Sequence, residues 1–174
     1  IAHTELFAKI GLSYPYNEYR TTWKLGGQSL VQRLADKGHD WGDLKKLIPH
    51  MLLEGIMGYP FSCPDMIGGG QFTSFLDDAP IDQELVVRST QVHALMPMMQ
   101  FSVAPWRILD ERHFNAVLDV VNLRNKFKET ILRLAKKASA NGEPIVRSME
   151  YVYPHKGYVD ITDQFMLGNS ILVA

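Results

Sequence analysis

A strand, a helix and a second strand follow one another in the middle of the sequence, and this order constrains the fold most. Residues 30–36 form a largely apolar run that ends in Asp36. Apolar residues then recur with helical spacing over 41–52, and residues 56–61 are again largely apolar. Parallel strands need a crossover connection such as this helix, whereas antiparallel strands can be joined by a tight turn. The sequence therefore predicts an α/β fold built on a parallel sheet.

Asp36 lies where the first of these strands ends and a loop begins. In α/β barrels the catalytic groups lie at the carboxyl ends of the strands, so a carboxylate at this place is a candidate acid. Arg33 and Lys37 are close to it in the sequence. On this stretch alone, the simpler interpretation is a loop aspartate that forms an ion pair with Arg33 and takes no part in catalysis.

Helix caps, hydrophobic periodicity and glycine stops predict the remaining elements. Before residue 142 these are a helix over 5–10 capped by Thr4, a strand over 16–23, a helix that begins at Asp40 and stops at Gly55, a helix over 82–93, a strand over 94–103 and a long helix between Asp110 and Gly142. Pro49 is expected either to kink the second of these helices or to lengthen its first turn. After it, strands are expected over 143–153, 164–167 and 170–173, with no helix between them. We therefore expect a domain boundary, with residues 1–141 in one unit and residues 142–174 at the start of an antiparallel β domain.

Composition and charge exclude several classes of function. The formal net charge is -1, so the chain has no basic footprint for nucleic acid or for anionic membranes. No apolar run approaches the length of a membrane span. Cys63 is the only cysteine, which excludes a disulfide within the chain, and no histidine base for it is evident. The six histidines show no paired ligand spacing, so we expect no metal ion.

The glycine run Gly68-Gly69-Gly70 follows the strand expected over 56–61. Glycines allow a sharp turn and a close approach of the backbone to a ligand. The lysine and serine of a phosphate-binding loop are absent here, and the glycine spacing differs from a dinucleotide-binding fingerprint. A tight loop at the end of a strand is therefore the stronger interpretation, and we expect no cofactor.

The remaining candidate functional residues are carboxylates and aromatic side chains at strand ends. The end of the segment 94–103 presents Phe101 and Ser102, followed by Trp106, as candidate substrate-binding residues; alternatively, its methionines fill irregular core. Such a combination of side chains suits sugars. Glycoside hydrolysis needs one carboxylic acid to protonate the leaving oxygen and a second carboxylate on the opposite side.

Several ordered blocks of the sequence resemble glycoside hydrolase family 31. They are Asn17-Glu-Tyr-Arg20, 30–36 with Asp40-Trp41, 58–70, 94–107, 142–147 and 164–168. Residues 14–174 resemble the second half of the family's catalytic barrel and the start of its C-terminal β-sandwich, in the branch with the myogenesis-regulating glycosidase and bacterial relatives. The resemblance implies the C-terminal half of a (β/α)8 TIM barrel, about strands five to eight, which runs into an antiparallel β-sandwich.

The resemblance also implies roles for individual residues. Asp36 corresponds to the family's general acid/base, in the loop after the sixth strand. Arg20 corresponds to an arginine near the scissile sugar. Asp65 corresponds to the aspartate at the end of the seventh strand, which shapes the sugar pocket.

Three positions depart from the pattern of the common glucosidases in this family. Those enzymes have a tryptophan three residues before the acid, where this chain has Arg33. They have an aromatic residue near the position of Gly69 and a histidine where this chain has Ser102. Because these positions contact the sugar in the family, the resemblance implies either an α-glucoside or an α-galactoside as substrate. Arg33 either faces the sugar or pairs with Asp36 or Asp65, and the sequence leaves both alternatives open.

The function that the resemblance implies is that of a retaining α-glycosidase, which hydrolyses O-glycosidic bonds of α-hexosides and takes an oligosaccharide or α-glycoside as substrate. The family's nucleophile is an aspartate at the end of the fourth strand, upstream of the matching region. We therefore expect the chain to be part of a longer protein, inactive by itself and able to self-associate through open sheet edges. Two alternatives remain: a carbohydrate-binding or regulatory pseudo-enzyme on the same barrel, and an unrelated α/β domain.

Overall fold

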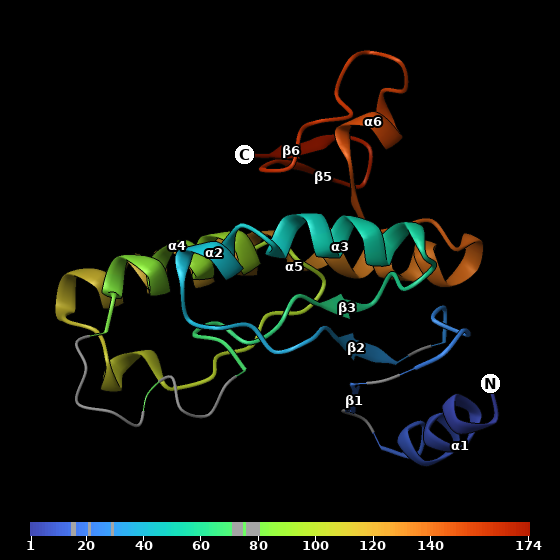
Figure 1. Ribbon diagram of the computed structural model, residues 1–174, viewed down its shortest axis with the longest axis horizontal. Coiled ribbons are helices and arrows are strands. Elements are labelled where there is room, and N and C mark those ends of the chain that lie inside the picture. The colour runs from blue at the N-terminus through green and yellow to red at the C-terminus, as the bar shows by residue number, and fades with distance from the viewer. Residues whose placement is uncertain (15–16, 21, 29, 71–74, 76–80) are drawn as a thin grey trace.

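The computed structural model describes residues 1–14, 17–20, 22–28, 30–70, 75 and 81–174 of the chain (Figure 1). In chain order its elements are α1 (Ala2–Gly11), β1 (Glu18–Tyr19), β2 (Val31–Arg33), α2 (Trp41–Leu44), α3 (Leu47–Ile56), β3 (Ser62–Cys63), α4 (Gln83–His93), the 3-10 helix η2 (Pro105–Arg107), α5 (Glu111–Asn141), β4 (Val146–Arg147), α6 (Met149–Val152), β5 (Phe165–Leu167) and β6 (Ile171–Val173). In Figure 1 the helices α3, α4 and α5 form a layer between the first three strands, below, and the last three strands, above.

The short strands β1, β2 and β3 form a parallel sheet in this order. Gln32 of β2 is paired both with Tyr19 of β1 and with Ser62 of β3. A further parallel bridge joins Ile67 to Phe101. The parallel arrangement expected from the strand–helix–strand order is therefore confirmed, although the second strand begins at Ser62 and not at residue 56. The carboxyl ends of the three strands lie side by side.

Three aspartates begin helices as the sequence predicts. The side chains of Asp40, Asp82 and Asp110 each accept a hydrogen bond from the backbone N–H three residues further on, at 2.8, 3.0 and 2.9 Å. Each bond satisfies one of the N–H groups that the start of a helix leaves without a partner. The last of these helices, α5, runs for 31 residues and ends at Gly142, whose φ is +74°. No helix in the described part of the chain is both long enough and apolar enough to cross a membrane.

The single helix expected between residues 40 and 55 is divided into α2 and α3. Pro49 lies in the first turn of α3, where its missing N–H costs no bond because the first four N–H groups of a helix have no partner within it. The prediction of a strand over 56–61 is wrong. Ile56 is the last residue of α3, and the chain then turns through Gly58, whose φ is +89°. β3 begins only after this turn.

Two expectations near the N-terminus are also corrected. Thr4 does not cap a helix but lies buried within α1, where its hydroxyl donates to the carbonyl of Trp23 at 3.2 Å and accepts from the N–H of Trp23 at 3.0 Å. These bonds tie α1 to the segment after β1. The strand expected over 16–23 is represented by β1; Tyr16 and Thr21 lie outside the described residues.

The strand expected over 94–103 is replaced by irregular chain. The guanidinium of Arg124 in α5 donates to the carbonyl oxygens of Ala94, Met96 and Pro97, at 2.8, 2.7 and 3.0 Å. These carbonyls are therefore taken by a side chain and not by a neighbouring strand. Pro97 also has no N–H to donate to such a strand.

The C-terminal residues form an antiparallel sheet in the order β4, β5, β6, which confirms the strands expected over 164–167 and 170–173. The strand expected over 143–153 is only partly present. After β4 the side chain of Ser148 accepts a hydrogen bond from the N–H of Tyr151 at 3.0 Å and caps the short helix α6. The expectation that no helix interrupts these strands is therefore wrong.

An apolar core joins this sheet to the helices. Its buried members include Met51 and Leu52 of α3, Ile131 and Leu134 of α5, and Ile145, Val146, Phe165 and Leu167. Apolar contacts therefore run across residue 142, and the division of the chain into two domains at that residue stays a prediction.

The end of α5 provides a test of this local backbone. We expect Gly142→Ala to lower the free energy of unfolding by about 1–2 kcal/mol, because a left-handed backbone brings Cβ too close to the following carbonyl oxygen. Gly142→Asn should lose less, since asparagine tolerates this conformation better. The control is Gly27→Ala, where no atom lies within 4 Å of the added Cβ and φ is not left-handed. Urea unfolding curves measure all three, and equal stability of Gly142→Ala and the unmodified protein would contradict the prediction.

Candidate active site

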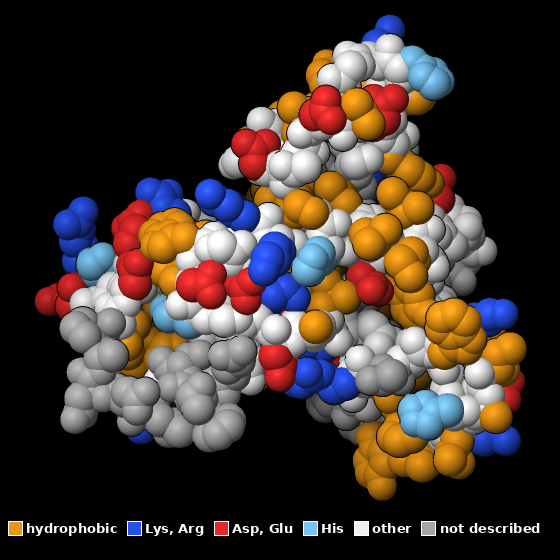
Figure 2. Space-filling model, viewed as in Figure 1, with side chains coloured by type: hydrophobic (Ala, Val, Ile, Leu, Met, Phe, Trp, Pro, Cys, Tyr) orange, Lys and Arg blue, Asp and Glu red, His pale blue; other side chains and the backbone are white. Residues whose placement is uncertain are grey.

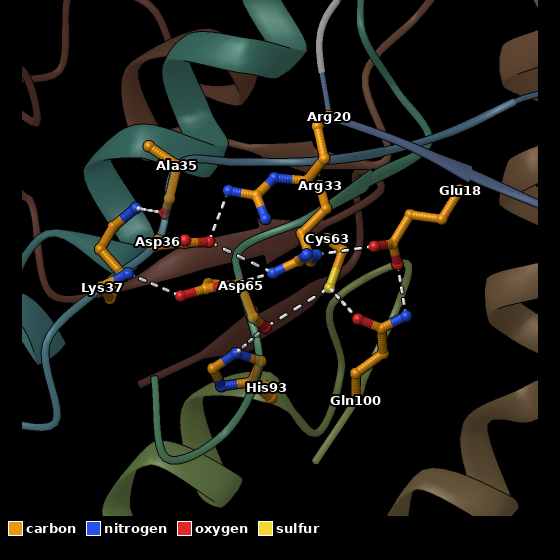
Figure 3. Close-up of polar contacts among 10 residues, drawn as sticks. All are labelled: Glu18, Arg20, Arg33, Ala35, Asp36, Lys37, Cys63, Asp65, His93 and Gln100. Carbon is orange, nitrogen blue, oxygen red and sulfur yellow. Dashed lines mark hydrogen bonds and ion pairs between the residues drawn. The ribbon is translucent and has the colours of Figure 1, made fainter. Parts of the chain in front are cut away.

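A fully buried carboxylate, that of Asp65, lies at the centre of a polar cluster at the ends of the parallel strands (Figure 3). Its Oδ1 accepts a hydrogen bond from Nη1 of Arg33 at 3.0 Å, and its Oδ2 accepts one from the backbone N–H of Lys37 at 2.6 Å. Its φ is +141°, a value that residues with side chains rarely adopt. A buried charge is tolerated where it is both paired and hydrogen-bonded, and Asp65 meets both conditions.

Arg33, the last residue of β2, connects this carboxylate to a second one. Its Nε donates to Oε1 of Glu18 in β1 at 2.6 Å, and the side-chain amide of Gln100 donates to the other oxygen of Glu18. Burial disfavours the charged guanidinium, but the hydrogen bonds to Glu18 and Asp65 outweigh burial, so that the pKa of Arg33 is raised. Arg33 is therefore a permanent cation held between two carboxylates.

Asp36 lies on the exposed side of the cluster. Its Oδ1 accepts a hydrogen bond from Nη2 of Arg20 at 2.5 Å and lies 3.4 Å from Nη1 of Arg33. The side chains of Asp36 and Arg20 are 38% and 45% exposed, whereas that of Arg33 is 12% exposed. Both arginines contact the same oxygen, and Oδ2 has no hydrogen bond to a residue that the structure describes. One oxygen of a partly exposed carboxylate is thus left for proton exchange with solvent or substrate.

The glycine run packs against the loop that carries Asp36. The N–H of Gly70 donates to the carbonyl of Lys37 at 3.2 Å. A Cβ at Gly69 would collide with the backbone of Lys37 and Gly38, and a Cβ at Gly70 would collide with the carboxyl group of Asp36. The glycines therefore allow two protein loops to approach each other, in agreement with the tight loop that the sequence indicates.

Two further titratable side chains, Cys63 and His93, are fully buried next to Asp65. Burial raises the pKa of the Cys63 thiol to about 12, so the thiol is not a nucleophile at neutral pH. Burial lowers the pKa of His93, whose ring nitrogens lie 2.7 Å from the carbonyl oxygen of Ser89 and 3.0 Å from that of Asp65. Across the described ranges, no group of three or more histidine, cysteine and carboxylate side chains is arranged to hold a metal ion. A carboxyl group that is partly exposed, such as that of Asp36, can give or take a proton.

The structure brings together four of the residues that the sequence indicates. Arg20, Arg33, Asp36 and Asp65 form one connected set of ion pairs (Figure 3). The pairs considered for Arg33, with Asp36 and with Asp65, are both present. Contacts of these four residues with a sugar stay predictions.

The other three candidate residues, Phe101, Ser102 and Trp106, are not part of this set of ion pairs. Phe101 forms the parallel bridge with Ile67, and the N–H of Ser102 donates to the carbonyl of Ile67 at 2.9 Å, which places both beside the loop after β3. Trp106 lies in η2 and is 70% exposed. Substrate contacts of these three residues also stay predictions.

Three members of the cluster are not indicated by the sequence, namely Glu18, Lys37 and Gln100. Glu18 carries a usable signal, because it stands two residues before Arg20 and alternate residues of a strand share a face. Lys37 is adjacent to Asp36, but a loop lysine is expected to point into water. No pattern in the sequence pairs Gln100 with Glu18, from which it is separated by 82 positions.

The sequence and the fold of the chain were compared with those of known proteins. No protein-family model matches the chain. The chain is 35% identical over 173 residues to the myogenesis-regulating glycosidase of Mus musculus, an alignment that covers 90% of the chain and 23% of that protein. It is 29% identical over 194 residues to an α-glucosidase of Saccharolobus solfataricus, covering 95% of the chain and 27% of that protein. The fold matches a family 31 α-glucosidase from Bacteroides thetaiotaomicron with a TM-score of 0.67 at 23% identity, over 82% of this chain and 24% of that one. The chain spans about a quarter of the length of these curated relatives.

The two arginines of the cluster should differ sharply in what they contribute to stability. Arg33→Gln leaves the carboxylates of Glu18 and Asp65 without their cation, and breaking a buried pair costs about 3–5 kcal/mol. Arg20→Gln removes an exposed pair, which is worth about 0–1 kcal/mol. Urea unfolding of the two variants measures the difference. Equal losses would show that Arg33 does not compensate a buried charge.

Proposed function

Because the chain is related over most of its length to glycoside hydrolase family 31, we propose that it forms part of the catalytic barrel of an α-glycosidase, with Asp36 as the general acid/base. The observation that carries this proposal is the placement of Asp36 itself. Its carboxyl group is partly exposed at the end of a parallel strand, with one oxygen held by Arg20 and the other without a described partner. In (β/α)8 barrels, this rim is where the catalytic groups lie.

The fold proposed for the chain is the C-terminal half of a (β/α)8 barrel, about strands five to eight, followed by the start of a β-sandwich. The parallel strands β1 to β3 and the antiparallel sheet β4 to β6 support it. Apolar side chains of α1 and α3 are exposed, among them Ile10, Leu53 and Ile56, and Figure 2 shows hydrophobic side chains gathered over α1 and toward the end of α3. The rest of a longer protein would cover such a surface, and without that cover the chain would self-associate.

In the proposed mechanism Asp36 acts in both steps of a retaining reaction. In the first step its Oδ2 gives a proton to the glycosidic oxygen as the bond from that oxygen to the anomeric carbon breaks and a bond from the nucleophilic carboxylate to the same carbon forms. In the second step the same oxygen takes a proton from the water that attacks the glycosyl-enzyme. The nucleophilic carboxylate comes from an aspartate outside this chain, roughly 5 Å from Asp36 as in other retaining enzymes. Arg20 exchanges its exposed ion pair with Asp36, worth at most about 1 kcal/mol, for an oxygen of the bound sugar.

The proposed substrate is an oligosaccharide or other α-glycoside with a gluco- or galacto-configured hexose. Three positions that the resemblance assigns to sugar contacts, Arg33, Gly69 and Ser102, carry no aromatic ring in this chain. Arg33 is already held by Glu18 and Asp65. The sugar pocket therefore has polar or small groups where an indole or another ring would select one configuration by stacking, and we include both hexoses.

A carbohydrate-binding or regulatory pseudo-enzyme on the same barrel is the second candidate. The observation that favours it is the pairing of Asp36 with two arginines through one oxygen, an arrangement that a structural loop aspartate also adopts. The sequence upstream discriminates between the candidates. An aspartate in the fourth-strand motif favours the enzyme, and another residue there favours the pseudo-enzyme.

The 174-residue chain alone should show no turnover of aryl α-glucosides or aryl α-galactosides. A retaining reaction needs both carboxylates, roughly 5 Å apart, and the chain supplies one of them. A chromogenic assay of the purified chain, beside the full-length protein as positive control, measures this. Activity of the chain alone would mean that the nucleophile lies within it.

Asp36→Asn in the full-length protein tests the acid/base role. The variant keeps the shape of the side chain but removes the proton transfer, which is typically worth about 10²–10⁴-fold. The loss should be large for glycosides with poor leaving groups and small in the first step for activated aryl glycosides, which need little protonation. Azide should partly restore turnover of the activated substrates, because a small anion attacks the glycosyl-enzyme without a general base.

Asp40→Asn is the matched control, since asparagine preserves the cap of α2 and this carboxylate is outside the proposed chemistry. It should leave all rates nearly unchanged. If Asp36→Asn instead lost the same activity on good and poor leaving groups and azide had no effect, Asp36 would be a structural residue.

A further inference from the structure

Lys37, the residue after Asp36, is 5% exposed although it lies in a loop at the rim of the sheet. Its Nζ turns back and donates to the carbonyl oxygen of Ala35 at 2.7 Å. Its backbone N–H donates to Oδ2 of Asp65 at 2.6 Å, and its carbonyl oxygen accepts from the N–H of Gly70 at 3.2 Å. The ammonium, the N–H and the carbonyl of this one residue are therefore all hydrogen-bonded, and Figure 3 shows the bonds of the first two.

These bonds fix the two peptide groups that flank Asp36. The peptide before Asp36 is held through the carbonyl of Ala35, and the peptide after it is held through the N–H of Lys37. Each peptide group is planar, so restraining both groups limits the freedom of Asp36 in φ and ψ and sets the direction of its Cα–Cβ bond. The side-chain partners of Asp36 hold it less firmly, because Arg20 is itself partly exposed and Arg33 contacts Asp36 only at 3.4 Å.

The inward position of the Lys37 ammonium is unfavourable by itself, because burial removes the charge from water. Burial lowers the pKa of Lys37, and the carboxylates of Asp65, Asp43 and Asp36 act against that effect. A loop lysine that extends into water avoids the desolvation, and an apolar side chain of similar length fills the space without it. An apolar side chain, however, cannot hold the carbonyl of Ala35.

We propose that Lys37 is a positioning residue, which orients the carboxyl group of Asp36 for proton transfer by fixing the peptide groups on either side of it. This inference rests on the proposed function of Asp36. The positioning matters most when substrate is bound, because Arg20 then contacts the sugar and the backbone keeps the carboxyl group in place. A misplacement of about 1 Å in such a group costs about 10²-fold in rate.

The test is Lys37→Met in the full-length protein, with kcat/KM measured for aryl α-glycosides whose leaving groups span a wide range of acidity. Methionine retains the apolar contacts of the lysine stem and donates no hydrogen bond. We expect a loss of about tenfold to a hundredfold for the least acidic leaving groups, which depend on protonation, and little loss for the most acidic ones. Lys45→Met is the matched control, because Lys45 is exposed at the end of α2, and it should keep the unmodified rates.

Lys37→Gln is the second variant, and it decides the matter if Lys37→Met does not fold. Glutamine keeps a donor directed toward Ala35 on a side chain that is one bond shorter, so it should lose less than methionine and still show the larger loss on poor leaving groups. An equal loss on all leaving groups, or no loss at all, overturns the proposal. If Lys37 has a purely structural role, its replacement changes the melting temperature but not the dependence of the rate on the leaving group.

Asp36→Asn, measured on the same substrates, separates this inference from the proposed function. If Asp36→Asn shows the leaving-group dependence and the Lys37 variants do not, Lys37 is not a positioning residue and the acid/base assignment stands. If Asp36→Asn shows no such dependence, the acid/base assignment fails and the inference falls with it.

Discussion

The compensation of the buried Asp65 carboxylate is the interaction on which the rest of the rim depends. The carboxylate is fully buried and needs both the cation of Arg33 and the N–H of Lys37. These partners come from the end of β2 and from the loop after it, while His93 of α4 contacts the carbonyl of Asp65. Asp65 therefore joins a strand and the loop that carries Asp36 through its side chain, and a helix through its backbone carbonyl. Because removal of one partner leaves an unpaired charge in the interior, the three parts hold their arrangement together.

Solvent exposure rises across the cluster, from the supporting pair of Asp65 and Arg33 to the pair of Asp36 and Arg20, which we propose takes part in the reaction. Asp65 is fully buried and Arg33 nearly so, and their ion pair is shielded from water and salt. Asp36 and Arg20 are partly exposed, so their ion pair is weak and easily exchanged for a ligand. An acid/base carboxylate needs surroundings that stay fixed while its own partners change. The buried pair of Arg33 and Asp65 can supply the fixed surroundings, and the exposed pair of Arg20 and Asp36 can be replaced.

The sequence predicts the features that depend on neighbouring residues. The three aspartate caps, the glycine that ends α5, the parallel order of the middle strands and the ion pair between Arg33 and Asp36 all follow from local spacing. Other features, set by distant residues, could not be predicted. Arg124 takes the carbonyls of the segment expected over 94–103 from a helix about thirty positions away, and the backbone of Lys37 is bound by Asp65 and Gly70, which lie about thirty positions further along the chain. Substrate contacts of the candidate residues stay predictions that follow from the family resemblance alone.

The most direct test of the account is a crystal structure of the full-length protein, as Asp36→Asn, with an aryl α-hexoside bound. The account predicts that the side chain at position 36 lies within hydrogen-bond distance of the glycosidic oxygen, that Arg20 contacts the sugar, and that the pair between Arg33 and Asp65 is unchanged. A sugar bound directly to Arg33 and Asp65, with position 36 remote from the glycosidic oxygen, would contradict both the acid/base role of Asp36 and the supporting role of the buried pair.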